Sequence, residues 1–300
     1  MVRAIPGVIV TWSWNAYIDD RDQAHGAGQP QEAAPRILTG VTEILLTSIQ
    51  PETRLQTEPM EAPIIRFQGV SKTYPNGTLA LRGVDLNIAR QDFIFLVGPS
   101  GAGKSTLVRL MIREEKATVG KIFLDGQELG RLKHRHLPKV RRKIGIVFQD
   151  FKLLPKLTVF ENVEFALRVT RGVDRLTRAK VEEVLSIVGL EGTEKKFPDE
   201  LSGGQQQRVA IARALSHDPK IFVADEPTGN LDPATSWEIL QLLLKINERG
   251  ATVVMATHNK EIVDILRKRV IVIDGGTVVR DDASGGYNEE LIAEEEQGVG

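Results

Sequence analysis

The sequence predicts an α/β protein with a mainly parallel core sheet, an antiparallel β subdomain and an inserted helical subdomain. Alternating apolar and polar residues at 63–70 and 79–89, on either side of the turn sequence YPNGT, predict antiparallel strands. Amphipathic patterns at 159–169 and 178–190, with no strand between them, predict the inserted helices. Buried parallel strands are predicted by four short apolar runs, at residues 93–98, 144–148, 221–225 and 253–258.

Three regions follow from the change of pattern along the chain. We expect residues 1–62, rich in Gly, Pro, Gln and charge, to be a poorly ordered N-terminal extension. Met60, which stands just before the regular pattern, leaves a start site misassigned upstream as an explanation for this extension. Residues 63–280 are expected to form one domain, with its helical subdomain at about 150–208. Residues 281–300, with seven acidic residues and no Lys or Arg, are expected to be a solvated acidic tail.

Composition excludes several classes of function. The chain has 300 residues, of which 41% are apolar and 26% are charged, as in a globular protein with a sizeable core. Its formal net charge of −1 gives no global basic field, so no nucleic-acid partner is expected. The absence of cysteine excludes disulfides and thiol catalysis. No apolar run approaches a membrane span and no signal-peptide cleavage site follows the apolar start, so any membrane role requires another anchor.

The four apolar runs end in residues suited to handling phosphate. They lead into the loop at Gly98, Gln149, the pair Asp225 and Glu226, and His258. Because ligands of open α/β sheets bind beyond the carboxyl ends of the strands, parallel strands would bring these groups to one edge. The sequence therefore predicts a site at that edge.

The loop GPSGAGKST, residues 98–106, has the spacing of a phosphate cradle. Gly98 and Gly103 allow backbone N–H groups to face a phosphate, Lys104 adds a positive charge, and the Ser105 hydroxyl can ligate Mg²⁺. A chance match is rare, and the preceding strand and following helix make a purely structural turn rarer still. The loop predicts nucleotide binding.

Further side chains would complete a hydrolytic site. Asp225 is suited to hold Mg²⁺, and Glu226 beside it could orient and deprotonate water. Gln149 could contact both metal and water, and His258 could donate to a γ-phosphate, although each alone could be a polar cap at the end of a strand. Tyr74 is either an ordinary turn aromatic or a platform on which adenine stacks.

A second glycine pair, in LSGGQQQRVAIARA at 201–214, again precedes a helical run, where a helix N-terminus favours anions. Together with GPSGAGKST, ADEPTGNLD and ATH, this segment resembles the ATPase domain of the ATP-binding cassette superfamily over about residues 63–276. The resemblance implies a P-loop NTPase fold of ABC type. It also implies an ATP hydrolase that uses ATP and Mg²⁺, and no motif residue departs from the pattern.

The resemblance assigns roles to individual residues. The catalytic residues would be Glu226, His258 and Gln149, and the metal ligands would be Ser105, Gln149 and Asp225. The nucleotide would be bound by Tyr74, Gly98, Pro99, Ser100, Gly101, Ala102, Gly103, Lys104, Ser105, Thr106, Ser202, Gly203, Gly204, Gln205 and Asp232. In this family two copies pack head to tail around two ATP molecules, so the loop at 201–205 would serve the nucleotide held by the partner's Lys104.

Within the superfamily, DEPTGNLD and the chain length resemble the branch that contains lipoprotein-releasing, macrolide-exporting and FtsE-type cell-division ATPases, and the segment at 131–163 most resembles the FtsE type. The FtsE type pairs with the membrane protein FtsX, works in peptidoglycan remodelling, and is peripheral at the cytoplasmic face of the inner membrane. An ATPase of a lipoprotein-releasing or macrolide transporter is the alternative. A soluble ATP-gated clamp on DNA or ribosomes is disfavoured by the lack of a long coiled coil.

Two exposed-looking segments could contact partners. The sequence FKLLPKL, residues 151–157, is a candidate docking site for a membrane subunit, through Phe151 or Leu154. The basic cluster at 131–143 holds seven Lys or Arg and two His. It is either an ordinary solvated face or a contact with the membrane surface or with the partner's cytoplasmic segment.

Overall fold

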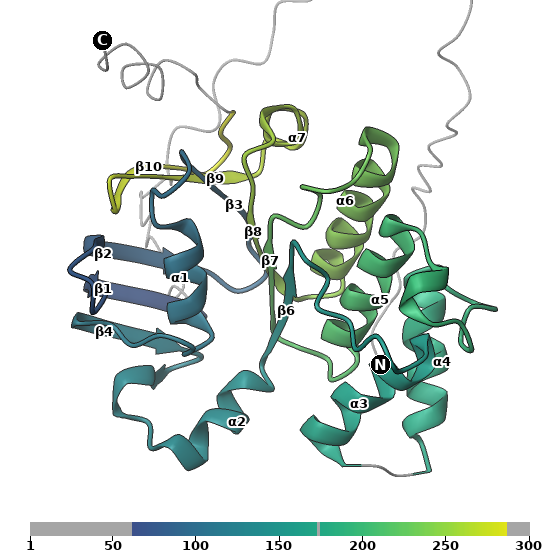
Figure 1. The fold of residues 1–300 in the computed structure, drawn as a ribbon. Helices are drawn as coiled ribbons and strands as arrows, with labels where there is room; N and C mark the ends of the chain where they lie inside the picture. Colours follow the sequence, from purple (N-terminus) through teal and green to yellow (C-terminus); the bar gives the residue numbers. More distant parts are fainter. Residues whose placement is uncertain (1–61, 173–174, 287–300) are drawn as a thin grey trace, which may run out of the picture. The chain divides into compact units, whose positions relative to one another are not determined.

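The computed structural model describes residues 62–172 and 175–286, which form two sheets with helices packed against them (Figure 1). The predictions for residues 1–61, and for most of the acidic tail, lie outside the described residues. Strand β10 runs to Asp282, so the first residues of the predicted tail belong to a sheet. None of the helices in the described part of the chain has the length and apolarity that crossing a bilayer requires.

The larger sheet has the strand order β10-β9-β3-β8-β7-β6. The four predicted runs form four adjacent parallel strands, with residues such as Ala224 and Met255 in register. The predicted fold class is confirmed. The bounds are β3 Phe93–Val97, β6 Ile144–Phe148, β7 Ile221–Asp225 and β8 Thr252–Ala256.

Two further strands extend this sheet beyond β3. Strand β9, Arg269–Asp274, pairs in parallel with β3, and β10, Thr277–Asp282, returns antiparallel to β9. The sequence analysis did not predict either strand. The cradle therefore leaves β3 between two neighbouring parallel strands, β8 and β9.

The smaller sheet is antiparallel, with the order β2-β1-β4-β5. Strands β1, Ile65–Thr73, and β2, Leu79–Ile88, are the predicted pair, and their turn is closed by a bond from Tyr74 N to Thr78 O at 2.9 Å. Strands β4, Val119–Leu124, and β5, Gln127–Glu128, complete the sheet and were not predicted.

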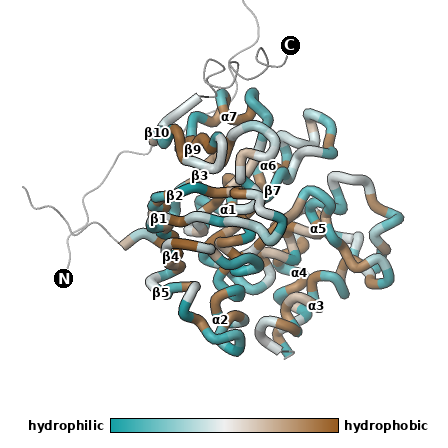
Figure 2. Tube along the Cα trace, turned by 60° about the vertical axis from the view of Figure 1, so that its left-hand side comes forward, coloured by the Kyte–Doolittle hydropathy of each residue, from teal (hydrophilic) through white to brown (hydrophobic). Residues whose placement is uncertain are grey.

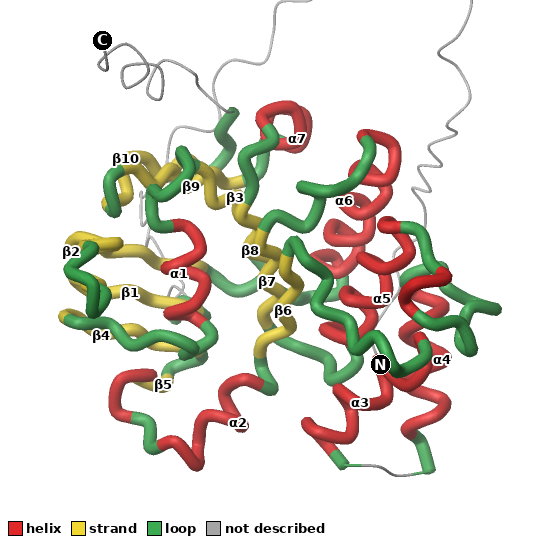
Figure 3. The backbone as a smooth tube through the Cα atoms, in the orientation of Figure 1, coloured by secondary structure: helices red, strands yellow, loops and turns green. Residues whose placement is uncertain are grey.

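The helices lie on both sides of the core sheet (Figures 1 and 3). The predicted inserted helices are confirmed as α3 and α4, and α5 packs against both. Thr158 starts α3 with a reciprocal capping box to Glu161, which satisfies two backbone donors at this end. The bounds are α1 Lys104–Met111, α2 Leu137–Arg141, α3 Val159–Arg171, α4 Thr177–Ile187, α5 Gly203–Leu215, α6 Pro233–Glu248 and α7 Lys260–Leu266.

Alternation along the strands divides the apolar residues into two buried clusters. Phe93 and Phe95 of β3 point toward α3 to α6, whereas Ile94 and Leu96 point toward α1 and the antiparallel sheet. Figure 2 shows the apolar residues concentrated inside the fold. Because both faces of the strands are buried, the sheet edge that carries the polar residues is held rigidly.

One carboxylate links the two sheets at the edge away from the cradle. Asp125, in the turn between β4 and β5, accepts hydrogen bonds from Lys143 at 2.7 Å, Arg90 at 2.7 Å and Lys220 at 3.2 Å. These cations precede β6, β3 and β7 respectively. Their hydrogen bonds, that of Lys143 above all, hold the pKa of Asp125 well below its usual range.

Candidate functional site

The predicted cradle is the turn between β3 and α1, and two of its positions require glycine. Gly98 has φ +147°, and a Cβ there would lie 2.0 Å from the Ile273 carbonyl oxygen of β9. Gly103 has φ +112°, and a Cβ would lie 2.7 Å from both Ala80 O and Leu81 Cδ2 of β2. The glycines thus allow close packing as well as the positive φ.

Lys104 is buried at the start of α1, with 8% of its surface exposed. Its Nζ donates to Gly98 O at 2.6 Å and to Pro99 O at 2.9 Å, so the amine is curled over the cradle's own carbonyls. Burial lowers the pKa of Lys104, and the negative charges of Glu226 and Asp225 oppose this. The cation is therefore held by neutral oxygens, which an anionic phosphate can displace.

The two acidic residues at the end of β7, Asp225 within the strand and Glu226 directly after it, lie beside the cradle. Burial raises the pKa of Asp225, and the Ser105 side chain of α1 opposes that shift. Ser105 is therefore close enough to the Asp225 carboxylate to act on it, which brings two of the predicted metal ligands together. A hydroxyl and a carboxylate oxygen placed together are the hard donors that Mg²⁺ prefers.

Glu226 turns the chain sharply away from the sheet. Its φ is +50°, and its N–H donates to Ala256 O of β8 at 2.9 Å, so the backbone of this residue is fixed between two strands. Its Oε2 lies 3.2 Å from Nδ1 of His258, whose ring remains largely exposed. The predicted base and the predicted histidine are thus in contact.

A cavity of about 450 Å³ connects these groups. It is lined by Ser100, Gly101, Gly103, Lys104, Ser105, Thr106, Glu226 and His258. A second cavity of about 380 Å³, on the side of the loop after β7, also reaches Glu226 and His258. Glu226 and His258 therefore border both cavities and separate the cradle from the loop that leads to α6.

Two predicted residues lie at the margin of this arrangement. Gln149 contacts Asn230, with Nε2 to Oδ1 at 3.5 Å, and does not line the 450 Å³ cavity. The Tyr74 hydroxyl lies 3.3 Å from Thr106 Oγ1, and Lys72 Nζ lies 4.8 Å from the Tyr74 ring centroid. Tyr74 is thus held beside the end of the cradle.

The second glycine pair is the start of α5, as predicted. Ser202 caps the helix by accepting from Gln205 N at 3.3 Å, and the Gln205 side chain accepts from Ser202 N. A Cβ on Gly204 would lie 2.4 Å from Thr235 Cγ2 at the start of α6. None of Ser202 to Gln205 lines the 450 Å³ cavity of the same chain.

Asp232 has a structural role that the sequence analysis missed. Its carboxylate caps α6 by accepting from Thr235 N at 3.0 Å, and hydrogen bonds from Thr235 lower its pKa. The Asp-Pro pair at 232–233 was an available signal, because Pro is favoured at the first position of a helix.

Side chains of α5 also hold the loops after β6 and β7. Gln207, fully buried, donates from Nε2 to Pro227 O at 2.7 Å. Arg213 donates to Phe151 O at 3.0 Å and to Lys152 O at 2.6 Å, both residues with positive φ. These contacts carried no sequence signal, because they join residues 20 and 61 to 62 positions apart.

The expectation that Phe151 and Leu154 are exposed needs correction. Both are half-buried, and Phe151 packs against the cluster of α3 to α6. The fully buried Asn162 of α3 fixes the Leu154 backbone: its side-chain oxygen accepts from Leu154 N, and its side-chain nitrogen donates to Leu154 O. Only part of this segment is therefore free for a partner.

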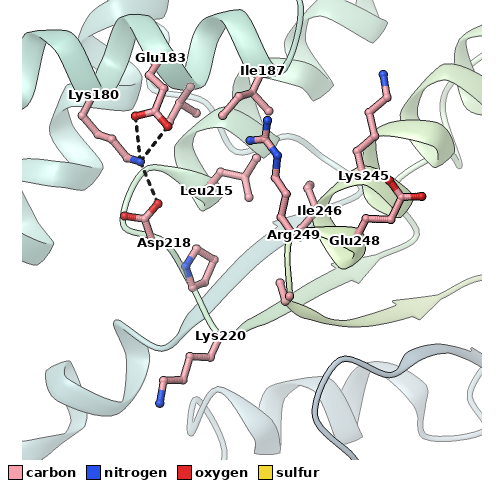
Figure 4. Close-up of a pocket in the computed structure, with 14 residues that line it drawn as sticks. Lys180, Glu183, Ile187, Leu215, Asp218, Lys220, Lys245, Ile246, Glu248 and Arg249 are labelled. Atoms are coloured by element: carbon pink, nitrogen blue, oxygen red, sulfur yellow. Dashed lines mark hydrogen bonds and ion pairs between the residues drawn. The ribbon is translucent and has the colours of Figure 1, made fainter. Parts of the chain in front are cut away.

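The largest of these cavities, about 550 Å³, is lined by none of these groups. Figure 4 shows the residues that line it. Its lining includes Lys220 and Ala251, which precede β7 and β8, so it lies at the amino ends of these strands. Lys180 on its wall is bound by Glu183 at 3.1 Å and Asp218 at 2.9 Å. Size alone does not make it part of the predicted site.

One edge of the parallel sheet carries a phosphate cradle with a buried lysine, a Ser–Asp pair and a Glu–His pair. These features together define a P-loop ATPase. The family model described as ABC transporter matches residues 81–229. The chain belongs to this family, because it is 54% identical to a family member that it matches over 98% of that protein's length, and it is an ATP hydrolase of ABC type.

Relatives within the family share most of their length with this chain. It is 54% identical over 224 residues to the cell division ATP-binding protein FtsE of Bacillus subtilis, covering 75% of this chain and 98% of FtsE. The FtsE proteins of Mycobacterium tuberculosis and Escherichia coli K12 are 48% identical over 226 residues and 44% identical over 213 residues. These matches cover 75% and 71% of this chain and 98% and 96% of the relatives.

Solved structures agree with this assignment. The dimeric ABC transporter cassette MJ0796 has a TM-score of 0.68 and 42% identity, over 74% of this chain and all of that one. Its dimeric post-hydrolysis state bound to ADP and Pi has a TM-score of 0.67 and 41% identity, with the same coverage.

Proposed function

We propose that the chain is the ATP-hydrolysing subunit of a bacterial cell-division complex, with an integral membrane partner resembling FtsX. The observation that carries this proposal is the match to FtsE proteins over 96–98% of their length, combined with an intact hydrolytic edge. In that complex, ATP turnover would drive the partner in peptidoglycan remodelling.

In the proposed site, the cradle residues 98–106 bind the phosphates and Lys104 contacts the β- and γ-phosphates. Mg²⁺ would be held by Ser105, Asp225 and Gln149, and it would neutralise phosphate charge. The influence of Ser105 on the pKa of Asp225 supports this assignment, because it requires the two oxygen donors to lie near each other. Tyr74 provides a face on which adenine can stack.

Glu226 is proposed as the general base that orients water, with His258 as a γ-phosphate donor. Their contact at 3.2 Å supports a paired role, because the histidine then positions the carboxylate. Gln149 would reach the metal and the water from the loop after β6. Its present contact with Asn230, at 3.5 Å, is long enough to be exchanged at little cost.

We further propose that two copies close head to tail around two ATP molecules. Ser202, Gly203, Gly204 and Gln205 of one copy would then contact the γ-phosphate bound by the other. The separation of these residues from the cradle cavity within one chain supports contact in trans. Asp232 would lie near the same interface as the cap of α6. Because ADP lacks the γ-phosphate, hydrolysis would release the closed pair.

The chain would be peripheral at the cytoplasmic face of the plasma membrane, held there by its partner. The loop at 151–157 supports a docking role, since Arg213 and Asn162 fix its backbone while Lys152, Pro155 and Lys156 stay exposed. Movement of this loop would also displace Gln149, which lies two residues before Phe151.

A mixing experiment tests the dimeric site. A Lys104→Ala subunit should bind no ATP, and a Ser202→Ala subunit should bind ATP but fail to complete the partner's pocket. Mixed in equal amounts, they should recover one working pocket per heterodimer, so turnover should exceed that of either variant alone. No recovery, with both variants folded and associated, would refute hydrolysis in trans.

A pull-down from membranes tests the choice of partner. Recovery of a four-span protein with a large external domain would support the cell-division role. Recovery of a lipoprotein-releasing or macrolide-exporting membrane subunit would favour the transporter role instead.

A further inference from the structure

The segment between β5 and β6 presents four exposed cations, none of which forms an ion pair with a carboxylate of the described residues; Arg135 donates to His136 Nε2 at 3.2 Å. It contains the short 3₁₀ turns Leu129–Arg131 and His134–His136, followed by α2. No acidic residue occurs from Leu129 to Gln149. We define its basic face by four exposed residues: Lys133, Arg135, Lys139 and Arg142.

The other cations of the segment are already engaged. Arg131 pairs with Glu128 at 3.1 Å, Lys143 pairs with Asp125 at 2.7 Å, and Arg141 donates to carbonyls at the end of α1. By contrast, no carboxylate within the described ranges pairs with a residue of the basic face. Glu128 and Asp125 are thus already paired with other cations, and the four charges of the basic face remain available to an external anion.

The apolar residues of the segment all turn inward. Leu129, Leu137 and Val140 are buried, and Leu132 packs against the same cluster. Among the large apolar side chains that the described chain exposes, none belongs to residues 129–143. Figure 2 shows hydrophilic residues on the loop that leads into α2. The segment therefore offers charge without an apolar anchor.

We propose that the basic face binds the anionic headgroups of a lipid bilayer, giving the chain a direct membrane contact besides its protein partner. A docked protein segment gains most of its binding energy from a few anchors, chiefly Trp, Tyr and Arg, that are desolvated in well-packed pockets. The four cations of the basic face are exposed and line none of the cavities described above, and no aromatic or large apolar side chain is exposed beside them in the segment. A lipid surface needs no such anchors, because its diffuse negative potential attracts each exposed Lys or Arg separately. The overall net charge of −1 disfavours a polyanion that would wrap more of the protein.

Vesicle co-sedimentation of the full chain, without any membrane protein, tests this proposal. The chain should sediment with phosphatidylcholine vesicles that contain phosphatidylglycerol and not with phosphatidylcholine alone. Each exposed cation near such a surface contributes about fivefold to partitioning. A variant with Lys133, Arg135, Lys139 and Arg142 all changed to Gln should therefore partition more than about a hundredfold less, with unchanged ATPase activity.

The matched control removes the same charge elsewhere. Changing Lys116, Lys121, Lys195 and Lys245 to Gln removes four exposed cations outside the segment and should leave most of the vesicle binding. Equal loss in both variants would refute a localised face. So would equal sedimentation of the unmodified chain with both kinds of vesicle.

Competition distinguishes the remaining sources of negative charge. An acidic peptide or a DNA duplex that binds the basic face more tightly than the anionic vesicles would overturn the lipid assignment. Because the vesicles contain no protein, this result is independent of whether an FtsX-like subunit is found.

Discussion

Changing Asp125 to Asn should destabilise the fold while leaving the nucleotide site intact. The side chain is 11% exposed and accepts from three cations, and the substitution removes the charge that all three face. Breaking a well-buried ion pair costs about 3–5 kcal/mol. Lys220 is 55% exposed and contributes little after solvent screening, whereas Lys143 and Arg90 are more enclosed, at 27% and 36%. We therefore expect a loss of about 3 kcal/mol.

The pH dependence of this loss has a defined sign. Because the pKa of Asp125 is lower in the folded than in the unfolded state, its stabilisation is fully present above the unfolded value of 3.8. It is lost as pH falls from there toward the folded value. The gap in unfolding free energy between the wild-type chain and Asp125→Asn should therefore be largest at neutral pH and should narrow below about pH 4.

Urea unfolding at pH 7 and pH 3.5 measures this gap, and thermal unfolding at pH 7 should show a fall of roughly 6–12 °C. Asp199→Asn, at an exposed position, is the matched control and should change stability by less than about 0.5 kcal/mol. Equal stability of Asp125→Asn and wild type at pH 7, or a gap that widens on acidification, would refute the reasoning.

Three substitutions at the site have distinct expected outcomes. Glu226→Gln should keep ATP affinity and accumulate an ATP-bound dimer in size-exclusion chromatography; a variant that stays monomeric at saturating ATP would contradict the closed pair. Gly98→Ala should lower the free energy of unfolding in urea by more than about 3 kcal/mol and abolish ATP binding, because its Cβ would lie 2.0 Å from a backbone oxygen. The control Gly101→Ala has open space around its Cβ and should lower the free energy of unfolding by only about 1 kcal/mol. Gly204→Ala should cost about 1–3 kcal/mol through its 2.4 Å clash with Thr235, and adding Thr235→Ser, which removes the clashing methyl, should recover most of it; no recovery would show that the clash is not the cause.

Local pattern predicted the parts of this fold that depend on neighbouring residues in the chain. The buried runs ending at Gly98, Gln149, Asp225 and His258 were assigned as strands from apolar content alone, and they are adjacent in the sheet. The order of those strands did not follow from the sequence, because it depends on pairing across long separations.

Contacts that depend on long separations left no such signal. Asp125 lies in an ordinary Asp-Gly turn, and its three cations come from 18 to 95 residues away in sequence. Phe151 looked exposed because its neighbours are Lys, Leu and Pro, yet it packs against helices that follow it. Its carbonyl is fixed by Arg213, a residue whose role depends on the orientation of α5.

Side chains along α5 donate hydrogen bonds to main-chain carbonyls of three other segments and so fix the position of the helix. Gln207 binds the loop beyond β7, Arg208 binds Val188 O at 2.7 Å after α4, and Arg213 binds the loop beyond β6. Because α5 is hydrogen-bonded to three segments along its length, a tilt of the helix would also move those segments. If a partner displaced the backbone near Phe151, these hydrogen bonds would couple that displacement to α5 and to Ser202 at its N-terminus, and a displacement of Ser202 would act on the loop in the same way.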